Sequence, residues 1–248
     1  MIEEVQNLIN KQKQSIIDLR IERDHVAEVQ KQKRKAELKA LQAQINPHFL
    51  YNTLNAITWQ AADQGMDDVS LMASSLGRFF RLSLSKGAEI ISLSDEVEHV
   101  RSYLNIQSIR YQDKLRYEID IPEGLLEYKV LKLILQPLVE NAIYHGIKEK
   151  KCGGLIRITA EEGRCEDEGT VCLMVWDDGV GIPEDKLTIM NQNLKNGVSG
   201  TSESYGICNV NERIRLYYGS SFGLAYESEA GSFTKAILTI PTQYREVE

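Results

Sequence analysis

The sequence predicts a multidomain protein in which an all-helical N-terminal region precedes a mixed α/β sandwich. Residues 1–44 contain neither Gly nor Pro and are rich in good helix formers, whereas strand-like patterns appear only after residue 92. Helices and strands mixed in this way over about 150 residues are typical of one α/β sandwich. We therefore expect a stalk over 1–44, a helical hairpin over 45–91 and an α/β domain over 92–243.

The stalk carries a heptad pattern with polar interruptions. Its apolar residues are Ile2, Val5, Ile9, Ile16, Leu19 and Val26, and the steps are three and four when Gln12 and Arg23 fill the gaps. The pattern fades from Gln30 to Lys35 and resumes at Leu38, one residue out of phase. A solvated single helix would account for the charges but not for the spaced apolar positions. The pattern predicts a parallel dimeric coiled coil.

Two amphipathic helices are expected after the stalk, joined by a turn at Gly65. The first ends near Ala62, and the second carries apolar residues near helical spacing. Two such hairpins in a dimer form a four-helix bundle. Pro47 lacks a backbone N–H, so we expect a kink there or a new helix with Asn46 as its cap.

The α/β domain is expected to begin with a helix whose N-terminus is marked by Ser94 and the acidic residues after it. Antiparallel-type strands and further helices should follow. The expected elements are a helix to about Gln112, a strand at Leu115–Ile121, a long apolar helix at Tyr128–Ile147, strands near 155–161 and 170–177, helices near 183–194 and 206–217, and strands near 223–228 and 233–240.

Charge and composition exclude several classes of protein. The formal net charge of −7 argues against a nucleic-acid binder that works by neutralising phosphates. The richest apolar run, Leu131–Val139, is interrupted by Lys132 and is far shorter than the roughly 18 residues of a membrane span. The polar start of the chain does not resemble a signal peptide. No two cysteines have Cys-x-x-Cys spacing, so we expect reduced structural thiols at Cys152, Cys165, Cys172 and Cys208.

Residues 136–146 form the first segment whose side chains could take part in chemistry. This apolar helical stretch contains Glu140, Asn141 and His145. Asn141 and His145 are four residues apart and share a helix face. A carboxamide oxygen there suits Mg²⁺, which prefers oxygen ligands. A polar patch at a helix edge would account for the same residues.

Three more segments carry glycines beside polar groups. Asp177 ends an apolar strand and is followed by Gly179 and Gly181, which allow close approach of the backbone to a ligand, although an acidic turn would look the same. Gly206 opens a helix after a flexible loop, and a helix N-terminus is a ready phosphate site. Residues 231–234 lie between two strands and are weak evidence alone.

Taken in order, these segments resemble the N, G1 and G2 boxes of the Bergerat-type ATP-binding fold of histidine kinases, gyrase, Hsp90 and MutL. Residues 41–52, Leu-Gln-Ala-Gln-Ile-Asn-Pro-His-Phe-Leu-Tyr-Asn, resemble the phosphoacceptor box of LytS/YesM-like sensor histidine kinases of bacterial two-component systems. The likeness covers roughly residues 36–242. The stalk is similar to the last helix of a HAMP linker, which implies the cytoplasmic part of a membrane receptor.

The resemblance implies a homodimeric protein-histidine kinase that uses ATP and Mg²⁺, located at the cytoplasmic face of the bacterial membrane. His48 would accept the γ-phosphoryl group and pass it to an aspartate of a response regulator. Asn141 would bind Mg²⁺, and His145 would lie near the nucleotide. Neutral imidazole offers a nucleophilic nitrogen without a strong base.

The remaining roles follow from the same resemblance. Asp177 would accept a hydrogen bond from the adenine amino group, while Gly179 and Gly181 let the purine pocket close. The loop from about 197 to 205 would be the ATP lid, and Gly206 would begin the helix on the phosphate side. His25 and His99 lack such a context and are expected to be structural.

The sequence also departs from the family pattern. Phe49 stands where many kinases have an acidic residue, which leaves Glu140 as a candidate base. Asn52, four residues after His48, is a candidate for orienting water in dephosphorylation of the regulator. Three further departures are Asp178 for Asn, Tyr144 for Lys and Ser204 for Gly. They leave open a degenerate nucleotide-binding scaffold as the alternative function; an ATPase of this fold would lack the phosphoacceptor hairpin.

Overall fold

The computed structural model describes residue 23 and residues 47–84, 89–150, 152–163, 169–197 and 205–242. Apart from Arg23, the predicted stalk lies outside the described residues, as do the first part of the phosphoacceptor box and the predicted cap at Asn46. The chain divides into two compact units, 1–50 and 51–248.

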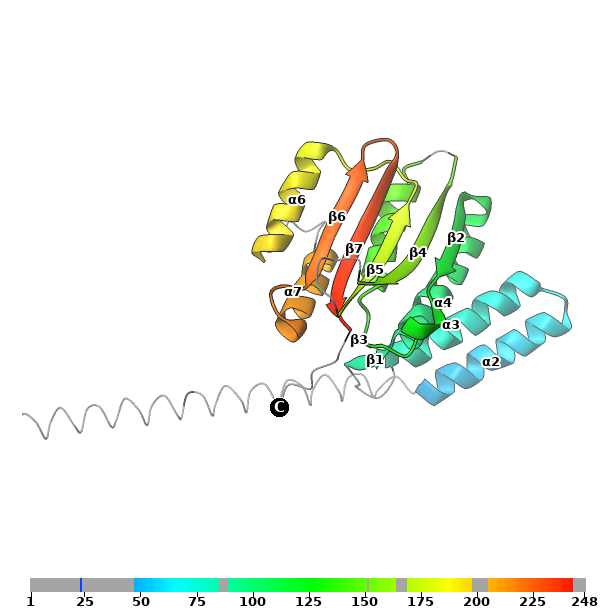
Figure 1. Cartoon of the computed structure of the whole chain (residues 1–248). Helices are drawn as coiled ribbons and strands as arrows, with labels where there is room; N and C mark the ends of the chain where they lie inside the picture. The colour runs from blue at the N-terminus through cyan, green and yellow to red at the C-terminus, as the bar shows by residue number, and fades with distance from the viewer. Residues whose placement is uncertain are drawn as a thin grey trace, which may run out of the picture. The chain divides into compact units, whose positions relative to one another are not determined.

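The expected hairpin is confirmed. Helix α2 (Pro47–Asp63) and helix α3 (Asp67–Leu84) are joined by a turn at Gly65, whose φ of +67° suits a residue without a side chain (Figure 1). The N–H of Met66 donates to the carbonyl of Ala61 at 2.8 Å and closes the turn. Leu54 on α2 is buried and faces Gly77 on α3, so the two helices pack directly.

A five-stranded sheet forms the centre of the α/β domain (Figure 1). Strands β2 and β4 are parallel, which corrects the expectation of antiparallel pairing throughout, and the other neighbours are antiparallel. A parallel pair needs a long crossover, and the helical stretch between β2 and β4 supplies it. In spatial order the strands are β2 (Leu115–Asp120), β4 (Gly154–Glu162), β5 (Thr170–Asp177), β7 (Phe233–Pro241) and β6 (Gly223–Glu229).

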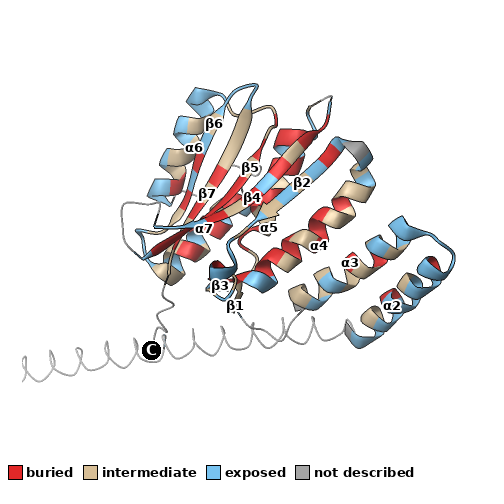
Figure 2. Cartoon of the chain, turned by 45° about the vertical axis from the view of Figure 1, so that its right-hand side comes forward, coloured by how far each residue is buried: buried red, intermediate tan, exposed pale blue. Residues whose placement is uncertain are grey.

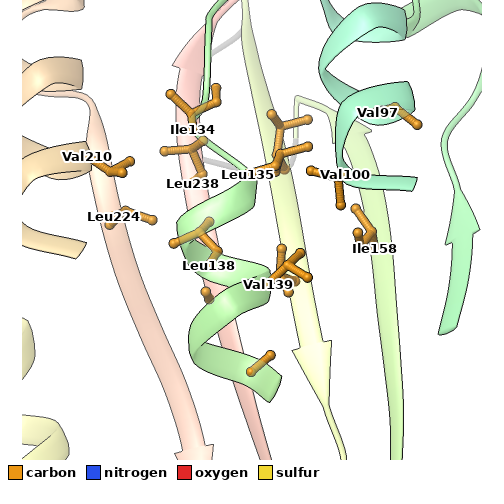
Figure 3. Packing of buried hydrophobic residues seen from close by; sticks show 14 of the residues in the cluster. Val97, Val100, Ile134, Leu135, Leu138, Val139, Ile158, Val210, Leu224 and Leu238 are labelled. Atoms are coloured by element: carbon orange, nitrogen blue, oxygen red, sulfur yellow. The ribbon is translucent and has the colours of Figure 1, made fainter. Parts of the chain in front are cut away.

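One face of this sheet packs against helices and forms the core. Buried and more exposed residues alternate along β4, β6 and β7, as expected where a single face meets a core (Figure 2). Figure 3 shows Leu135, Leu138 and Val139 among sheet residues such as Leu238 and Ile158. The helices are α4 (Leu93–Tyr111), α5 (Gln136–Asn141), α6 (Glu184–Asn196) and α7 (Tyr205–Tyr218), with a π-helical turn η3 (Ala142–Ile147) and short 3₁₀ turns η1 (Gln112–Lys114) and η2 (Glu123–Leu125).

The expected long helix over 128–147 is wrong. Its first part is strand β3 (Lys129–Leu131), which pairs with a strand that the sequence did not reveal, β1 (Ile90–Ser92). Leu133 then adopts a positive φ of 60°, and the helix begins only at Gln136. A short, mostly apolar run carries no clear period by which a buried strand can be told from a buried helix.

A buried carboxylate holds the turn between β3 and α5. Glu96 accepts hydrogen bonds from the backbone N–H groups of Leu133, Ile134 and Leu135 at 2.8–2.9 Å. Burial raises the pKa of Glu96, and these three donors oppose that rise. Glu96 thus satisfies backbone donors at the start of α5 that have no partner within the helix.

The cap of α4 also differs from the expectation. The capping side chain belongs to Ser92, not Ser94, and accepts from the N–H of Asp95 at 3.1 Å. Two serines spaced by one residue give the same local signal, and the end of β1 at Ser92 decides between them.

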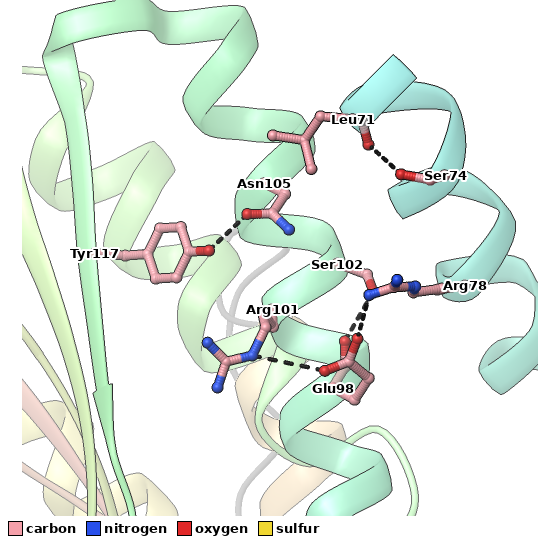
Figure 4. Close-up of polar contacts among 8 residues, drawn as sticks. All are labelled: Leu71, Ser74, Arg78, Glu98, Arg101, Ser102, Asn105 and Tyr117. Atoms are coloured by element: carbon pink, nitrogen blue, oxygen red, sulfur yellow. Dashed lines mark hydrogen bonds and ion pairs between the residues drawn. The ribbon is translucent and has the colours of Figure 1, made fainter. Parts of the chain in front are cut away.

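Helix α3 packs along α4. Arg78 pairs with Glu98 at 3.1 Å, as Figure 4 shows. The ring of Phe79 stacks on that of His99, which is buried. The predicted structural role of His99 is confirmed. Among the residues described, no helix combines the length and apolar character that a membrane span requires.

Candidate active site

Asp177 stands at the end of β5 and is almost fully buried, with 2% of its surface exposed. Its Oδ1 accepts a hydrogen bond from the N–H of Gly179 at 2.9 Å. The pKa of this carboxyl is raised to about 7, chiefly by burial; the charge of Asp178 adds to the rise, and the Gly179 N–H and Lys150 oppose it. A carboxyl that titrates near neutrality at a strand end is a candidate binding group.

Two glycines enclose this carboxyl. A Cβ on Gly146, in η3, would collide with Oδ1 of Asp177, and one on Gly179 would collide with both Asp177 and the backbone of Gly146. Gly179 thus has a steric reason to lack a side chain, while its predicted role in closing a purine pocket stays a prediction. Gly146 was not singled out from the sequence, and its position in the segment 136–146 was the only signal for it.

The loop after Asp177 is fastened to the hairpin of β6 and β7. Gly181 has a φ of +68°, and a side chain there would strike the carbonyl of Glu229. The N–H of Gly231 donates to Val180 at 2.7 Å, and the N–H of Ile182 donates to the hydroxyl of Ser228 at 2.8 Å. The segment 231–234, singled out in the sequence, therefore supports the loop that follows Asp177.

The departure at Asp178 has a structural explanation. Its Oδ1 accepts from the N–H of Leu155 at 2.8 Å, and its Oδ2 lies 3.2 Å from the ammonium group of Lys150. The same ammonium donates to the carbonyl of Asp178 at 2.6 Å. Asp178 thus ties β4 to the loop, and Lys150, which the sequence analysis missed, balances its charge.

The segment 136–146 presents its polar residues at the junction of α5 and η3. Asn141 is half-buried, and no described group forms a hydrogen bond with its carboxamide. His145 is exposed one turn later. A π-helical turn of this kind is often found at functional sites. The carboxamide oxygen of Asn141 is therefore free to accept a hard cation such as Mg²⁺.

Tyr144 and Glu140 have specific neighbours. The ammonium group of Lys148 lies 5.5 Å from the centre of the exposed Tyr144 ring, so a positive charge accompanies the tyrosine that replaces the usual lysine. Gln136 donates a hydrogen bond of 2.7 Å to Oε1 of Glu140. Burial raises the pKa of Tyr103, and Glu140 and Tyr144 raise it further.

The remaining predicted residues lie on helices. His48 and Asn52 are exposed on the first two turns of α2. His48 belongs to the first compact unit and Asp177 to the second, so the meeting of phosphoacceptor and nucleotide stays a prediction. Gly206 is exposed in the first turn of α7 with open space around it, and the predicted lid over 198–204 with Ser204 lies outside the described residues.

The thiols show no pairing in the described part of the chain. Cys152, Cys172 and Cys208 form no disulfide, and Cys165 lies outside the described residues. Within the described ranges no three His, Cys, Asp or Glu side chains converge on a common point.

Two family descriptions match the chain. "Histidine kinase" matches residues 36–115, and "Histidine kinase-, DNA gyrase B-, and HSP90-like ATPase" matches residues 127–244. Solved structures with a similar chain include the blue-light activated histidine kinase domain of Erythrobacter litoralis (TM-score 0.45, 18% identity, 85% of this chain and 94% of that one) and the catalytic domain of histidine kinase ThkA (TM-score 0.47, 18% identity, 63% and 97%).

Curated relatives are sensor kinases. Over 84% of this chain, the sequence is 37% identical to sensor histidine kinase YesM of Bacillus subtilis and 32% identical to sensor histidine kinase BtsS of Escherichia coli. Over 86% of this chain, it is 36% identical to sensor protein LytS of Streptococcus agalactiae. It spans about a third of the length of these relatives, 34–35%. With two matched regions in the order in which the hairpin and the α/β domain occur, the chain belongs to the LytS/YesM family of sensor histidine kinases.

Proposed function

We propose that this chain is the ATP-dependent kinase part of a two-component sensor. It would transfer the γ-phosphoryl group of ATP to His48 and then to an aspartate of a response regulator. The observation that carries the proposal is the buried Asp177 carboxyl at a strand end, enclosed by Gly146 and Gly179. This arrangement suits recognition of a flat base by a single acceptor.

Asp177 has one oxygen to offer. Its Oδ1 accepts from the N–H of Gly179, which leaves Oδ2 for the exocyclic amino group of adenine. Only the ionised carboxyl is a pure acceptor, and the donated hydrogen bond from the base favours that form. Binding of ATP should therefore be accompanied by release of a proton from Asp177 near neutral pH.

The phosphates would extend from the base toward η3 and α7. Phosphoryl transfer depends on positioning and on neutralisation of charge rather than on covalent help. Asn141 would hold Mg²⁺, which when bound neutralises phosphate charge and orients the transferred group. Lys148 beside Tyr144 adds a cation, and the N-terminus of α7 near Gly206 adds backbone donors.

In the transfer itself an imidazole nitrogen of His48 attacks the γ-phosphorus. The N–P bond forms as the P–O bond to ADP breaks, and the imidazole proton passes to a base. Glu140 is our candidate for that base, and Gln136 orients its carboxylate. Asn52 remains a candidate for orienting the water that dephosphorylates the regulator.

Apolar side chains exposed on the hairpin support a homodimer. Exposed large apolar residues on and between α2 and α3 are Phe49, Ile57, Trp59, Met66, Val69 and Leu71. A second hairpin would cover them in a four-helix bundle. We further propose that the full-length protein is anchored in the membrane, with this part on the cytoplasmic side.

The test is incubation with Mg²⁺ and γ-labelled ATP of the purified chain, His48→Gln and Asn141→Asp. The proposal predicts acid-labile label on the wild type and none on either variant. Label on His48→Gln would identify another nucleophile. ATP binding without any label on the wild type would instead favour the degenerate scaffold, for which the departures at Tyr144 and Ser204 are the sequence argument.

A further inference from the structure

Tyr226 lies on the same face of the sheet as Asp177. On β6 it pairs with Ala236 of β7, which pairs in turn with Val175 of β5. Asp177 stands two residues beyond Val175 on β5, and residues two apart on a strand point to the same face. Since Ala236 is small, the sheet leaves room for the Tyr226 ring between β6 and the end of β5.

The hydroxyl of Tyr226 is buried without a hydrogen-bond partner. The residue is 6% exposed, and no described group bonds with its Oη. Its backbone is held firmly, because the side-chain amide of Asn191 accepts from its N–H and donates to its carbonyl, both at 2.9 Å. Buried hydroxyl groups in proteins nearly always have a partner, so this one calls for an explanation.

Two titratable groups lie near this hydroxyl. Burial raises the pKa of Tyr226 above its ordinary value, and the negative charge of Asp177 raises it further; Cys208, near the start of α7, is the second group. The hydroxyl therefore keeps its proton and is a donor. No hydrogen bond joins it to Asp177, although the charge of the carboxylate reaches it.

We propose that the Tyr226 hydroxyl is a second base-recognition group of the nucleotide site. It donates a hydrogen bond, directly or through one buried water, to a ring nitrogen of the purine whose amino group is bound by Asp177. Adenine presents a ring-nitrogen acceptor beside its amino donor. The Tyr226 hydroxyl and the Asp177 carboxylate are the complementary donor and acceptor on one face of the sheet. This inference rests on the proposed binding of ATP.

The first test is Tyr226→Phe, which keeps the ring and removes only the hydroxyl. We expect the Kd for ATP, measured by calorimetry, to rise about five- to tenfold, the effect of one hydrogen bond. Without nucleotide, the melting temperature of the variant should equal or exceed that of the wild type, because an unpaired buried group is gone. Tyr128→Phe is the matched control, since Tyr128 bonds with Glu162 at the protein surface.

The second test removes the acceptor instead. ATP analogues in which N1, N3 or N7 is replaced by C–H are titrated against the wild type and Tyr226→Phe. One analogue should lose affinity for the wild type and none for the variant. Equal ATP affinity of the two proteins, or additive losses with every analogue, would overturn the inference and leave ATP binding standing. A wild type that binds no ATP would overturn both proposals.

Discussion

The imidazole ring of His99 in α4 stacks on the phenyl ring of Phe79 in α3, with ring centroids 4.5 Å apart and an angle of 20° between the planes. Nε2 of His99 lies 2.8 Å from the hydroxyl of Ser83, and the ammonium group of Lys132 donates to the carbonyl of Ser83 at 2.7 Å. The hairpin and the α/β domain thus meet at a neutral histidine. Burial, together with the positive charge of Lys132, lowers the pKa of His99 to about 4.

We therefore expect acid to weaken the folded chain through His99. Between pH 6.5 and 4 the unfolded state binds a proton at this residue that the folded state does not, so the free energy of unfolding falls as the pH falls. The loss is on the order of 3 kcal/mol across that window. Urea unfolding of the wild type and of His99→Gln, followed at several pH values, measures it. His145→Gln, an exposed control, should behave as the wild type; parallel profiles for all three proteins would contradict the prediction.

Asp177 should make ATP binding depend on pH, with affinity lost on acidification. Because its pKa is about 7 in the free protein, acidification protonates the acceptor that adenine needs, and affinity should fall by about tenfold per pH unit below 7. The phosphates of ATP also titrate, and they affect every variant equally. The pH dependence due to Asp177 is therefore the difference in ATP affinity between the wild type and Asp177→Asn. That variant should bind weakly and lack the additional pH dependence.

The same carboxyl affects stability without nucleotide. Its folded pKa exceeds the usual value of 3.8, so the folded state retains a proton that the unfolded state releases. Its contribution to the free energy of unfolding is present below about pH 4 and is lost as the pH rises through 7. Calorimetric melting of the wild type should therefore fall more steeply over this range than that of Asp177→Asn.

Gly146→Ala should damage the site through sterics alone. The added methyl group would occupy the position of the Asp177 carboxylate, which is held by Gly179 and has little room to move. We expect ATP affinity to fall at least about tenfold, the effect of losing a hydrogen bond to a charged group. Gly124→Ala, in η2 with open space around it, is the control and should bind ATP normally. An unaffected Gly146→Ala protein would mean that this close approach does not shape the pocket.

Glu96→Ala should be strongly destabilising. Three backbone N–H groups at the turn before α5 would lose their shared acceptor in the core, at a cost of about 3 kcal/mol or more. Glu98→Gln removes a carboxylate only two residues away, but from an exposed ion pair with Arg78, and should cost less than about 1 kcal/mol. Denaturant midpoints of the two variants test the contrast, and similar values would contradict it.

Local patterns in the sequence predicted much of the fold. The hairpin was predicted from helical spacing and Gly65, and most strands from alternation, because those signals depend on near neighbours. The elements around Leu133 were not predicted. There the pairing of β3 with β1 and the carboxylate of Glu96 replace the start of a helix that the apolar run favours. Such contacts join residues about 40 positions apart and leave no local periodicity.

The candidate site likewise has features that the sequence predicts and features that only the tertiary structure shows. The sequence by itself determined which groups are present: the carboxyl of Asp177, the flexible Gly179 and Gly181, the amide of Asn141 and the imidazole of His48. Only the tertiary structure placed Gly146 against Asp177, Lys150 beside Asp178 and the unpaired Tyr226 hydroxyl on the same wall. The register of β5, β7 and β6 places Tyr226 and Asp177 on one face, and strand register is decided by packing of whole faces rather than by any single segment.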